Sequence, residues 1–319
     1  MGALEELYAG IDVGGTNVKV GIVDARGNVL LRKHDPINMH DAPPDVIVGL
    51  GKKLLEETLV ECNLKQEQLL GVGIGCPGQV ELSGVVHAAA NFPSWHDVPL
   101  QQLFADALGL PVTLCNDADA AVLAEQWVGS AKDNIKNFIM LTLGTGVGFG
   151  LIVDGKLVRG GTNTIEGGHL IVERNGRLCG CSQRGCLEAY SSAGALVLEA
   201  QEHVNAGADS KLAAYPPEEI NAKLMFDLAA EGDQMCKRLI EEAAEYLGFA
   251  CVSFSRILDP EMIVLSGGMA NAGPHFIDLV RKFYTKYAWT RFPNPVRIEL
   301  ANAGYDSGII GAAASFKLL

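Results

Sequence analysis

One stretch of the chain, residues 166–188, constrains the fold more than any other. An imidazole and three thiols fall within eighteen residues there: His169, Cys179, Cys181 and Cys186. These are the four soft ligands that a tetrahedral structural zinc site needs. Two carboxylates, Glu166 and Glu188, flank the cluster. The pattern predicts a rigid, zinc-bound corner that displays hydrogen-bond acceptors, as a polyhydroxylated substrate would require.

Length and composition favour a globular protein with two lobes. The chain has 319 residues, which exceeds one average domain, and it is 48% hydrophobic and 20% charged. The formal net charge is −13 and the pI is near 5.0. This charge argues against nucleic-acid and anionic-membrane partners, because no basic surface would neutralise their phosphates. An anionic nucleotide could still bind through backbone amides and a divalent cation.

The cysteines and the N-terminus favour a soluble, cytoplasmic protein. Five further cysteines lie in apolar segments, as reduced, buried thiols usually do: Cys62, Cys76, Cys115, Cys236 and Cys251. The first residues carry acids where a secretory signal would carry bases. No apolar run reaches membrane-spanning length, so we expect no membrane partner.

Hydrophobic periodicity predicts an α/β chain. Strands are expected at 7–13, 18–23, 29–32, 70–75, 112–115, 138–143, 148–153, 156–158, 262–265 and 296–300. Helices are expected near 44–62, 118–129, 187–204, 233–257, 274–288 and 307–317.

An internal repeat supports two related lobes. Residues 14–24 and 144–154 have equal length, begin at a Gly/Thr turn and end in Ile-Val-Asp. Chance similarity of two Gly-rich hairpins is the alternative. We predict a small N-terminal lobe of residues 1–115, joined by a C-terminal helix at 303–319. Residues 116–302 would form the large lobe with the zinc motif and would face the small lobe across a cleft.

Two glycine-rich turns are candidates for phosphate binding. Residues 12–17 read Asp-Val-Gly-Gly-Thr-Asn at the end of a strand, where bare backbone lets N–H groups approach an anion. Asp12 could hold magnesium through water. Residues 143–147 offer the same arrangement in the second lobe. Neither turn has the Gly-Lys-Ser/Thr of a P-loop, and a plain tight hairpin is the alternative for each.

A polar pair, Asn116 and Asp117, follows one predicted strand and precedes a helix. Polar residues at this position project from the carboxyl edge of an α/β sheet. Asp117 could accept a proton from a substrate hydroxyl while Asn116 orients that substrate. Helix capping is the alternative for both residues. Asp119 is expected to be a surface acid favoured by the helix dipole.

Taken in order, these motifs resemble the ROK family of sugar kinases, within the sugar kinase/actin/Hsp70 superfamily. The resemblance covers nearly the whole chain. It comprises DVGGTN at 12–17, GCPG at 75–78, NDADA at 116–120, LGTGVG at 143–148, EGGH at 166–169, CGCSQRGCLE at 179–188 and LSGG at 265–268.

The resemblance implies an α/β fold of two actin-like (ribonuclease H-like) lobes that close on sugar and ATP, with an interlobe cleft. It implies Asp117 as the catalytic base. The residues implied at the sugar are Gly78, Asn91, Asn116, Asp117, Glu166, His169 and Glu188. Those implied at ATP and Mg²⁺ are Asp12, Gly14, Gly15, Thr16, Asn17, Gly144, Thr145, Gly146, Gly267 and Gly268. Structural Zn²⁺ would take His169, Cys179, Cys181 and Cys186.

Two departures from the family pattern concern the pockets. Asp119 stands where many glucokinases of the family have Asn, and Met269 stands where a third Gly is frequent. Trp95 is a candidate for the mouth of the sugar pocket, with ordinary packing as the alternative.

The expected reaction is phosphoryl transfer from ATP to the 6-hydroxyl of a hexose, preferably glucose. The alternatives are a kinase for mannose, fructose, N-acetylmannosamine or N-acetylglucosamine, and use of polyphosphate as donor. A repressor of the same family is the less expected function. The eleven residues before Asp12 are too few for a DNA-binding domain, and the net charge is negative. The family implies a homodimer.

Overall fold

Two five-stranded sheets with the same strand order organise the chain. The computed structural model describes residues 6–132, 134–161, 165–272, 274–289, 291 and 296–319. The first sheet has the order β3-β2-β1-β4-β7 and the second β10-β9-β8-β11-β12. Their strands are β1 (Leu7–Val13), β2 (Asn17–Asp24), β3 (Val29–Pro36), β4 (Leu69–Cys76), β7 (Val112–Asn116), β8 (Phe138–Leu143), β9 (Val147–Val153), β10 (Lys156–Leu157), β11 (Met262–Ser266) and β12 (Arg297–Leu300). The shared order confirms the predicted α/β class and gives the repeated hairpins a structural counterpart.

Contacts divide the chain into two compact units. Unit 1 comprises residues 1–136, 150–165 and 302–319, and unit 2 comprises residues 137–149 and 166–301. We predicted a lobe boundary after residue 115, whereas residues 116–136 and 150–165 pack with unit 1. Residues 1–5 of the predicted small lobe lie outside the described residues. The assignment of functional lobes stays a prediction.

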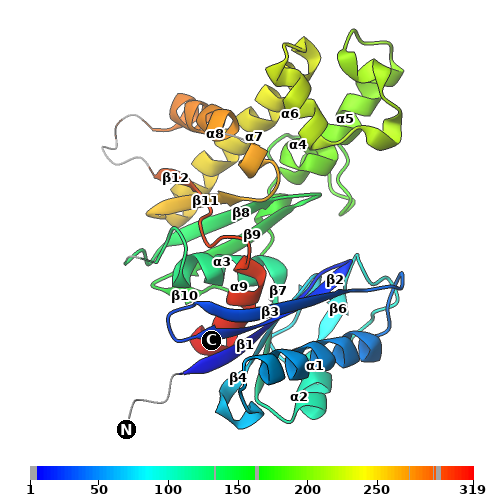
Figure 1. Ribbon diagram of the computed structural model, residues 1–319. Helices are drawn as coiled ribbons and strands as arrows, with labels where there is room; N and C mark the ends of the chain where they lie inside the picture. The colour runs from blue at the N-terminus through cyan, green and yellow to red at the C-terminus, as the bar shows by residue number, and fades with distance from the viewer. Residues whose placement is uncertain (1–5, 133, 162–164, 273, 290, 292–295) are drawn as a thin grey trace. The chain divides into compact units, whose positions relative to one another are not determined.

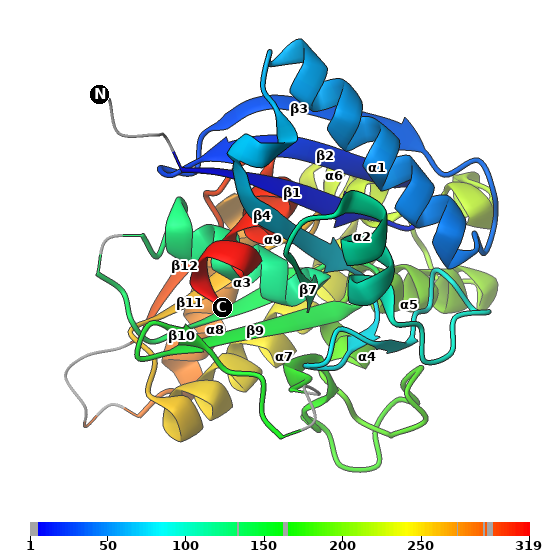
Figure 2. The same cartoon turned by 90° about the horizontal axis from the view of Figure 1, so that it is seen from below.

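Helices cover both faces of the first sheet in unit 1 (Figure 2). They are α1 (Pro44–Glu61), α2 (Leu100–Leu108), α3 (Asp117–Trp127) and α9 (Ser307–Leu318). Because side chains alternate along a strand, neighbours in β1 face opposite helices. Ile11 points to Gly51 of α1, whereas Gly10 faces α9. A short hairpin of β5 (Gln79–Val80) and β6 (Val86–Ala88) is inserted between β4 and α2.

Helix α9 approaches the sheet closely because glycines leave its backbone room (Figure 1). A Cβ on Gly73 of β4 would lie 1.6 Å from the Ala312 carbonyl oxygen, and one on Gly10 would lie 2.0 Å from that of Ile309. On α9 itself, a Cβ on Gly311 would lie 1.8 Å from the Ala120 carbonyl oxygen of α3. No larger residue fits at these positions without displacing backbone.

A buried carboxylate fixes the chain where it enters α9. Glu125 of α3 is 1% exposed. It accepts hydrogen bonds from the backbone N–H groups of Asn302 (2.9 Å), Ala303 (2.7 Å) and Ser130 (2.7 Å). Such bonds compensate the cost of burying the charge, and they join α3 to the start of the C-terminal segment.

Unit 2 carries the remaining helices. They are α4 (Glu188–Ser191), α5 (Ala193–Asn205), α6 (Ala222–Ala230), α7 (Gln234–Leu258) and α8 (Pro274–Tyr287). The single helix predicted at 187–204 was wrong, because Ser192 is extended (φ −91°, ψ 158°) and its side chain caps α5 by accepting from the Ala195 N–H. Among the described residues, no helix has the length and apolar character to cross a bilayer.

We predict that Gly73→Ala destabilises the protein by about 1–3 kcal/mol, because the added methyl group meets the α9 backbone. Gly49→Ala is the matched control, since a Cβ on this α1 glycine has nothing within 4 Å. The control should gain about 0.5–1 kcal/mol from helix propensity. Urea unfolding followed by circular dichroism measures both, and equal stability of the two variants would contradict the packing account.

Candidate functional site

The turn at residues 12–17, here the first turn, connects β1 to β2 in unit 1. The Gly14 N–H donates to the Asn17 carbonyl at 2.9 Å, and the Thr16 carbonyl accepts from the Ile37 N–H at 2.7 Å. These bonds hold the turn shape and leave Gly15 and Thr16 exposed. A Cβ on Gly15 would lie 2.2 Å from the Asn91 amide nitrogen. The first turn and Asn91, predicted separately, therefore lie together.

Asp12 lies beside this turn and carries an ion pair that the sequence did not predict. Lys19 Nζ is 3.1 Å from Asp12 Oδ2. The antiparallel register of β1 and β2 places the two residues opposite each other. The hairpin register was the signal that could have revealed the pair. A Cβ on Gly308, at the start of α9, would lie 2.5 Å from the same oxygen, so the helix begins against Asp12.

Asn116 both caps α3 and contacts Gly78. Its side-chain oxygen accepts from the Ala118 N–H at 2.7 Å, and its Nδ2 donates to the Gly78 carbonyl at 2.7 Å. Gly78 has φ +112°, and a Cβ there would lie 2.3 Å from the Ala88 carbonyl oxygen. The capping alternative is thus correct for Asn116, and the same side chain fixes the position of Gly78.

Asp117 begins α3 and has an accessible carboxylate whose ionisation is disfavoured. Its Oδ1 accepts from the Ala118 N–H at 2.9 Å. Partial removal from water raises the pKa of the Asp117 carboxyl above the ordinary 3.8. The negative charge of Asp12 raises this pKa further. The Ala118 N–H opposes this rise. A carboxylate that binds a proton more readily than usual suits a general base.

Two other candidates in unit 1 have structural surroundings. Trp95 is 1% exposed, donates to the Ala42 carbonyl at 2.9 Å and stacks on Phe92, which favours the packing alternative over a pocket mouth. Asp119 is not the surface acid that we expected. Its carboxylate is 14% exposed and lies 3.7 Å from Arg159 Nε.

The turn at residues 143–147, here the second turn, rests on the start of α5 in unit 2. The Gly144 N–H donates to the Gly146 carbonyl at 3.0 Å, and the Ala193 N–H donates to the Gly144 carbonyl at 2.8 Å. A Cβ on Gly194 would lie 2.6 Å from the Thr145 carbonyl oxygen. Gly144 and Thr145 stay exposed.

The glycines after β11 meet the second turn. Strand β11 runs parallel to β8, and their carboxyl ends therefore meet at one edge of the sheet. Gly267 has φ +91°, and a Cβ there would lie 2.4 Å from the Leu143 carbonyl oxygen. Gly268 is exposed, whereas Met269 is fully buried. The methionine therefore packs in the core of unit 2, away from solvent.

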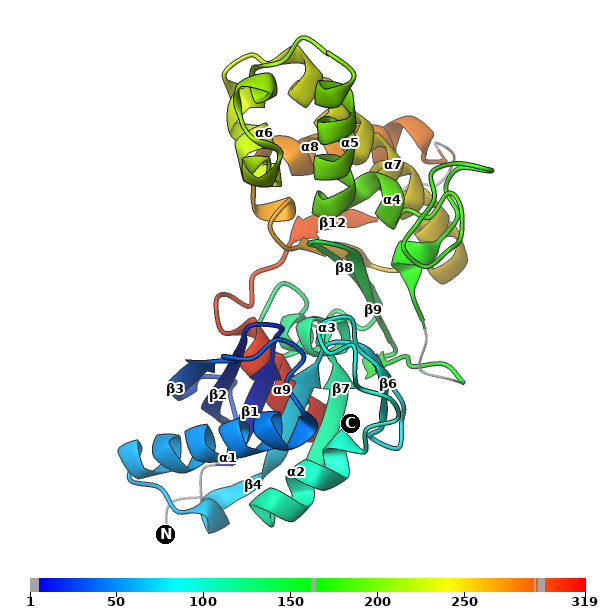
Figure 3. The same ribbon diagram turned by 90° about the vertical axis from the view of Figure 1, so that its right-hand side faces the viewer.

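The segment 166–188, here the metal-binding segment, leads into α4 (Figure 3). The four predicted metal ligands converge in it. One ligand atom from each of them lies within 4.8 Å of the others: His169, Cys179, Cys181 and Cys186. His169 Nδ1 is 3.7 Å from Cys179 Sγ, and Cys181 Sγ is 3.6 Å from Cys186 Sγ. Zn–S bonds of about 2.3 Å in a tetrahedron place sulfurs about 3.8 Å apart, so the donor set fits zinc.

The thiols of this set differ in how readily they ionise. Burial raises the pKa of Cys179 to about 12. The backbone N–H of Gln183 lowers the pKa of Cys181 to about 7. Zinc binds thiolates, so its binding would release protons from this set. With Nδ1 toward the sulfurs, the Nε2 atom of His169 remains for a substrate or a second hydrogen bond.

Glu188 joins the metal-binding segment to the second turn. Its Oε2 accepts from the Val147 N–H at 3.0 Å, and the Cys179 sulfur lies 3.4 Å from its Oε1. A Cβ on Gly146 would lie 2.4 Å from Oε2. Glu166, at the other end of the segment, is exposed and its carbonyl accepts from the His169 N–H at 3.0 Å.

A cavity of about 560 Å³ adjoins this cluster within unit 2. The residues that line it include Cys179, Glu188, Thr145, Gly194 and Arg177. The structure thus brings the predicted residues together in two groups, one in each unit. Arg177 and its partners are the part of the second group that the sequence did not predict.

Comparison with known proteins assigns the chain to a family. The ROK family profile matches residues 8–318, so the protein belongs to the ROK family. A glucokinase from Thermotoga maritima is 34% identical over 97% of this chain and 96% of its own. A glucokinase from Halalkalibacterium halodurans is 33% identical over 95% and 93%.

The solved structure of a ROK family glucokinase from Streptomyces griseus, in complex with glucose and AMPPNP, is similar with a TM-score of 0.78. It is 30% identical and covers 96% of this chain and 98% of that one. This likeness confirms the predicted fold class. Relatives with other names include an N-acetylmannosamine kinase from Vibrio vulnificus, 30% identical over 96% of this chain and 97% of its own. A xylose repressor from Caldicellulosiruptor bescii is 27% identical over 96% and 76%.

We predict that the purified protein carries about one zinc ion per chain, because the four ligand atoms fit a tetrahedral site. Cys186→Ser should lose that zinc and lower the melting temperature, since metal binding contributes directly to folding. Cys236→Ser, a buried thiol at the start of α7, is the control and should keep the metal. Elemental analysis by plasma mass spectrometry measures both, and full zinc content in Cys186→Ser would contradict the assignment.

Proposed function

We propose that the protein is an ATP-dependent sugar kinase that phosphorylates the 6-hydroxyl of a hexose, with glucose as the preferred substrate. Two glucokinases at 33% and 34% identity, matched over nearly their whole length, support the class of activity. The observation in the structure that carries the proposal is Asp117, an accessible carboxylate with a raised pKa at the end of β7.

The proposed reaction requires mainly that the protein positions the sugar and ATP. Phosphoryl transfer aligns a hydroxyl oxygen with the γ-phosphate and stabilises the charge that develops on it. In the proposed reaction Asp117 takes the proton of the sugar 6-hydroxyl as that oxygen bonds to phosphorus and ADP leaves. Asn116 orients the sugar beside it and holds Gly78, whose bare backbone lets the ring approach.

The two glycine-rich turns supply the proposed phosphate contacts. Gly14, Gly15, Thr16 and Asn17 would act from the first turn, and Gly144, Thr145 and Gly146 from the second. Gly267 and Gly268 would lie at the nucleoside. Asp12 would hold Mg²⁺ through water, since Lys19 already pairs with one of its oxygens. Magnesium, when bound, offsets the negative charge of the phosphates.

The residues proposed for sugar binding offer carboxylate, amide and imidazole partners for hydroxyl groups. They are Asn91, Asn116, Asp117, Glu166, His169 and Glu188. Zinc would orient His169 without taking part in phosphoryl transfer. The proposal keeps a cytoplasmic location and a homodimer as expectations.

A kinase for another sugar is the second candidate, and the N-acetylmannosamine kinase relative at 30% identity is the observation that favours it. An N-acetyl group at carbon 2 would need room near the metal-binding segment. A sugar-responsive repressor is the third candidate, because a xylose repressor is also similar.

We predict that turnover with MgATP is highest on glucose in a panel that also holds mannose, fructose, N-acetylglucosamine and N-acetylmannosamine. A coupled assay of ADP release measures it. Preference for an N-acetyl sugar would replace glucose and leave the kinase class intact. No turnover on any member, with zinc-loaded and folded protein, would contradict the proposed function.

We predict that Asp117→Asn lowers kcat by about 10²- to 10⁴-fold while the dissociation constant for the sugar stays similar, because the base is lost and the shape is kept. The raised pKa means that the ionised carboxylate destabilises the fold above that pKa, so the variant should melt at or above the wild-type temperature at pH 7. Asp119→Asn is the control and should keep kcat within about fivefold. Near-normal turnover in Asp117→Asn would refute the assignment of the base.

A further inference from the structure

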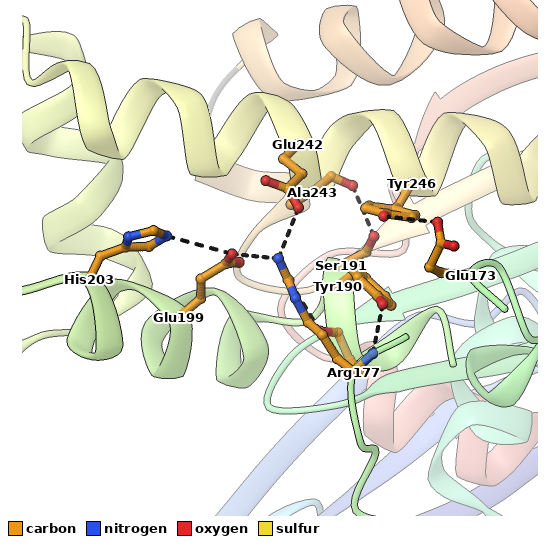
Figure 4. Close-up of polar contacts among 10 residues, drawn as sticks. Glu173, Arg177, Tyr190, Ser191, Glu199, His203, Glu242, Ala243 and Tyr246 are labelled. Carbon is orange, nitrogen blue, oxygen red and sulfur yellow. Dashed lines mark hydrogen bonds and ion pairs between the residues drawn. The ribbon is translucent and has the colours of Figure 1, made fainter. Parts of the chain in front are cut away.

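Arg177 connects the metal-binding segment to three helices of unit 2 (Figure 4). It lies two residues before the ligand Cys179. Its guanidinium forms an ion pair with Glu199 of α5 and another with Glu242 of α7, the latter at 2.8 Å. The same group lies over the ring of Tyr190 in α4, 4.4 Å from the centroid. One side chain therefore contacts α4, α5 and α7.

The backbone of Arg177 is held as well. Its N–H donates to the Tyr190 hydroxyl at 2.8 Å. A Cβ on Gly176 would lie 2.0 Å from that hydroxyl, so a glycine precedes the arginine because the tyrosine occupies the space. Tyr190 is buried and its ring centroid lies 4.1 Å from that of Tyr246 on α7. These contacts give the chain a defined position just before Cys179.

Helix α4 links the position of Arg177 to that of Glu188. Tyr190 and Glu188 lie two residues apart on the same four-residue helix. The helix is also tied to α7, because the Ser191 hydroxyl donates to the Ala243 carbonyl at 2.9 Å. The Glu188 carboxylate lies between the Cys179 sulfur and the Val147 N–H. Any displacement of α4 against the metal-binding segment would change both contacts.

We propose that Arg177 is a positioning residue for the sugar-binding group. It holds the metal-binding segment against α4, so that Cys179 stays in the zinc site and Glu188 stays beside the second turn. The inference rests on the proposed function, because Glu188 and His169 are taken there as sugar contacts. Its chemistry requires arginine, since only a planar guanidinium can stack on Tyr190 and pair with two carboxylates at once.

A matched control exists in the same unit. Arg281 of α8 donates from Nε to the Ile298 carbonyl at 2.9 Å and pairs with Glu299 of β12 at 3.0 Å. It connects a helix to a strand through hydrogen bonds and an ion pair, and its partners Ile298, Glu299 and Asp278 lie outside the metal-binding segment. Arg281→Met therefore removes similar stabilisation without the proposed positioning role.

The test uses zinc-loaded, full-length protein in four forms: wild type, Arg177→Met, Arg177→Lys and Arg281→Met. Zinc release into a chromophoric chelator and the KM values for sugar and for MgATP are measured. Loss of a residue that supports metal ligands typically changes metal affinity or activity by about 10- to 100-fold. We expect zinc release and the sugar KM to rise about tenfold in Arg177→Met, with the MgATP KM within about twofold.

Arg177→Lys should fall between wild type and Arg177→Met, because it keeps the charge and loses the stacking. Arg281→Met should lower the melting temperature and leave zinc release and the sugar KM unchanged. An Arg177→Met protein that only melts earlier, with unchanged zinc release and KM, overturns the proposal. If that variant does not fold, wild-type behaviour of Arg177→Lys in both measurements overturns it.

Two outcomes separate this inference from the proposed function. A wild-type protein that phosphorylates no sugar refutes the proposed function, and zinc release alone then decides the role of Arg177 at the metal-binding segment. A wild-type protein that carries no zinc overturns the role of Arg177 directly, whatever its activity.

Discussion

Backbone contact between α9 and the glycines of β1 and β4 sets the geometry of unit 1. Gly10 and Gly73 leave room for the carbonyl groups of α9, and Gly311 lets α3 approach from the other side. Asp12 stands at the end of β1 against the start of α9, and Asp117 begins α3. The same packing therefore fixes both carboxylates. Glu125 adds to it by binding the backbone that leads into α9.

Unit 2 also has close backbone packing at its glycines, and it adds polar contacts and a cluster of candidate zinc ligands. The metal-binding segment has little regular structure, and its position comes from Arg177, from Glu188 and from the convergent ligands. The second turn is hydrogen-bonded to the start of α5, and its Val147 N–H donates to the carboxylate of Glu188 in α4. Phosphate-binding and sugar-binding candidates in this unit are thus linked through one carboxylate.

Much of the fold could be predicted from the sequence, because the signals for its strands and turns are local. The strand 7–13 follows from an apolar run that only Asp12 interrupts, and the repeated hairpins follow from their glycine turns. The candidate zinc ligands were recognised from residue type and spacing, and the structure brings them together. The helix predicted at 187–204 failed at Ser192, because a serine in a helical pattern does not reveal that it caps the next helix. Helices α2 and α6 are short and were not predicted.

The missed parts of the site depend on contacts between distant segments. Lys19 pairs with Asp12 through strand register, and Arg177 meets Glu199 and Glu242, which lie 22 and 65 residues away. Asp119 was expected at the surface, but Arg159 from another segment shields it. No local pattern identifies the partners of Arg177 and Asp119, so tertiary structure was needed to find them, whereas the hairpin register could have revealed the pair of Asp12 and Lys19.

In the proposed reaction, this chain moves the γ-phosphate of ATP onto a sugar 6-hydroxyl. Phosphorus-31 NMR of a mixture of protein, MgATP and glucose tests it directly, because it reports the bond that forms and its position. We expect a phosphate monoester signal that is coupled to the two protons on carbon 6 and that grows in step with ADP. A monoester at another carbon, or ADP that accumulates with inorganic phosphate alone, would contradict it.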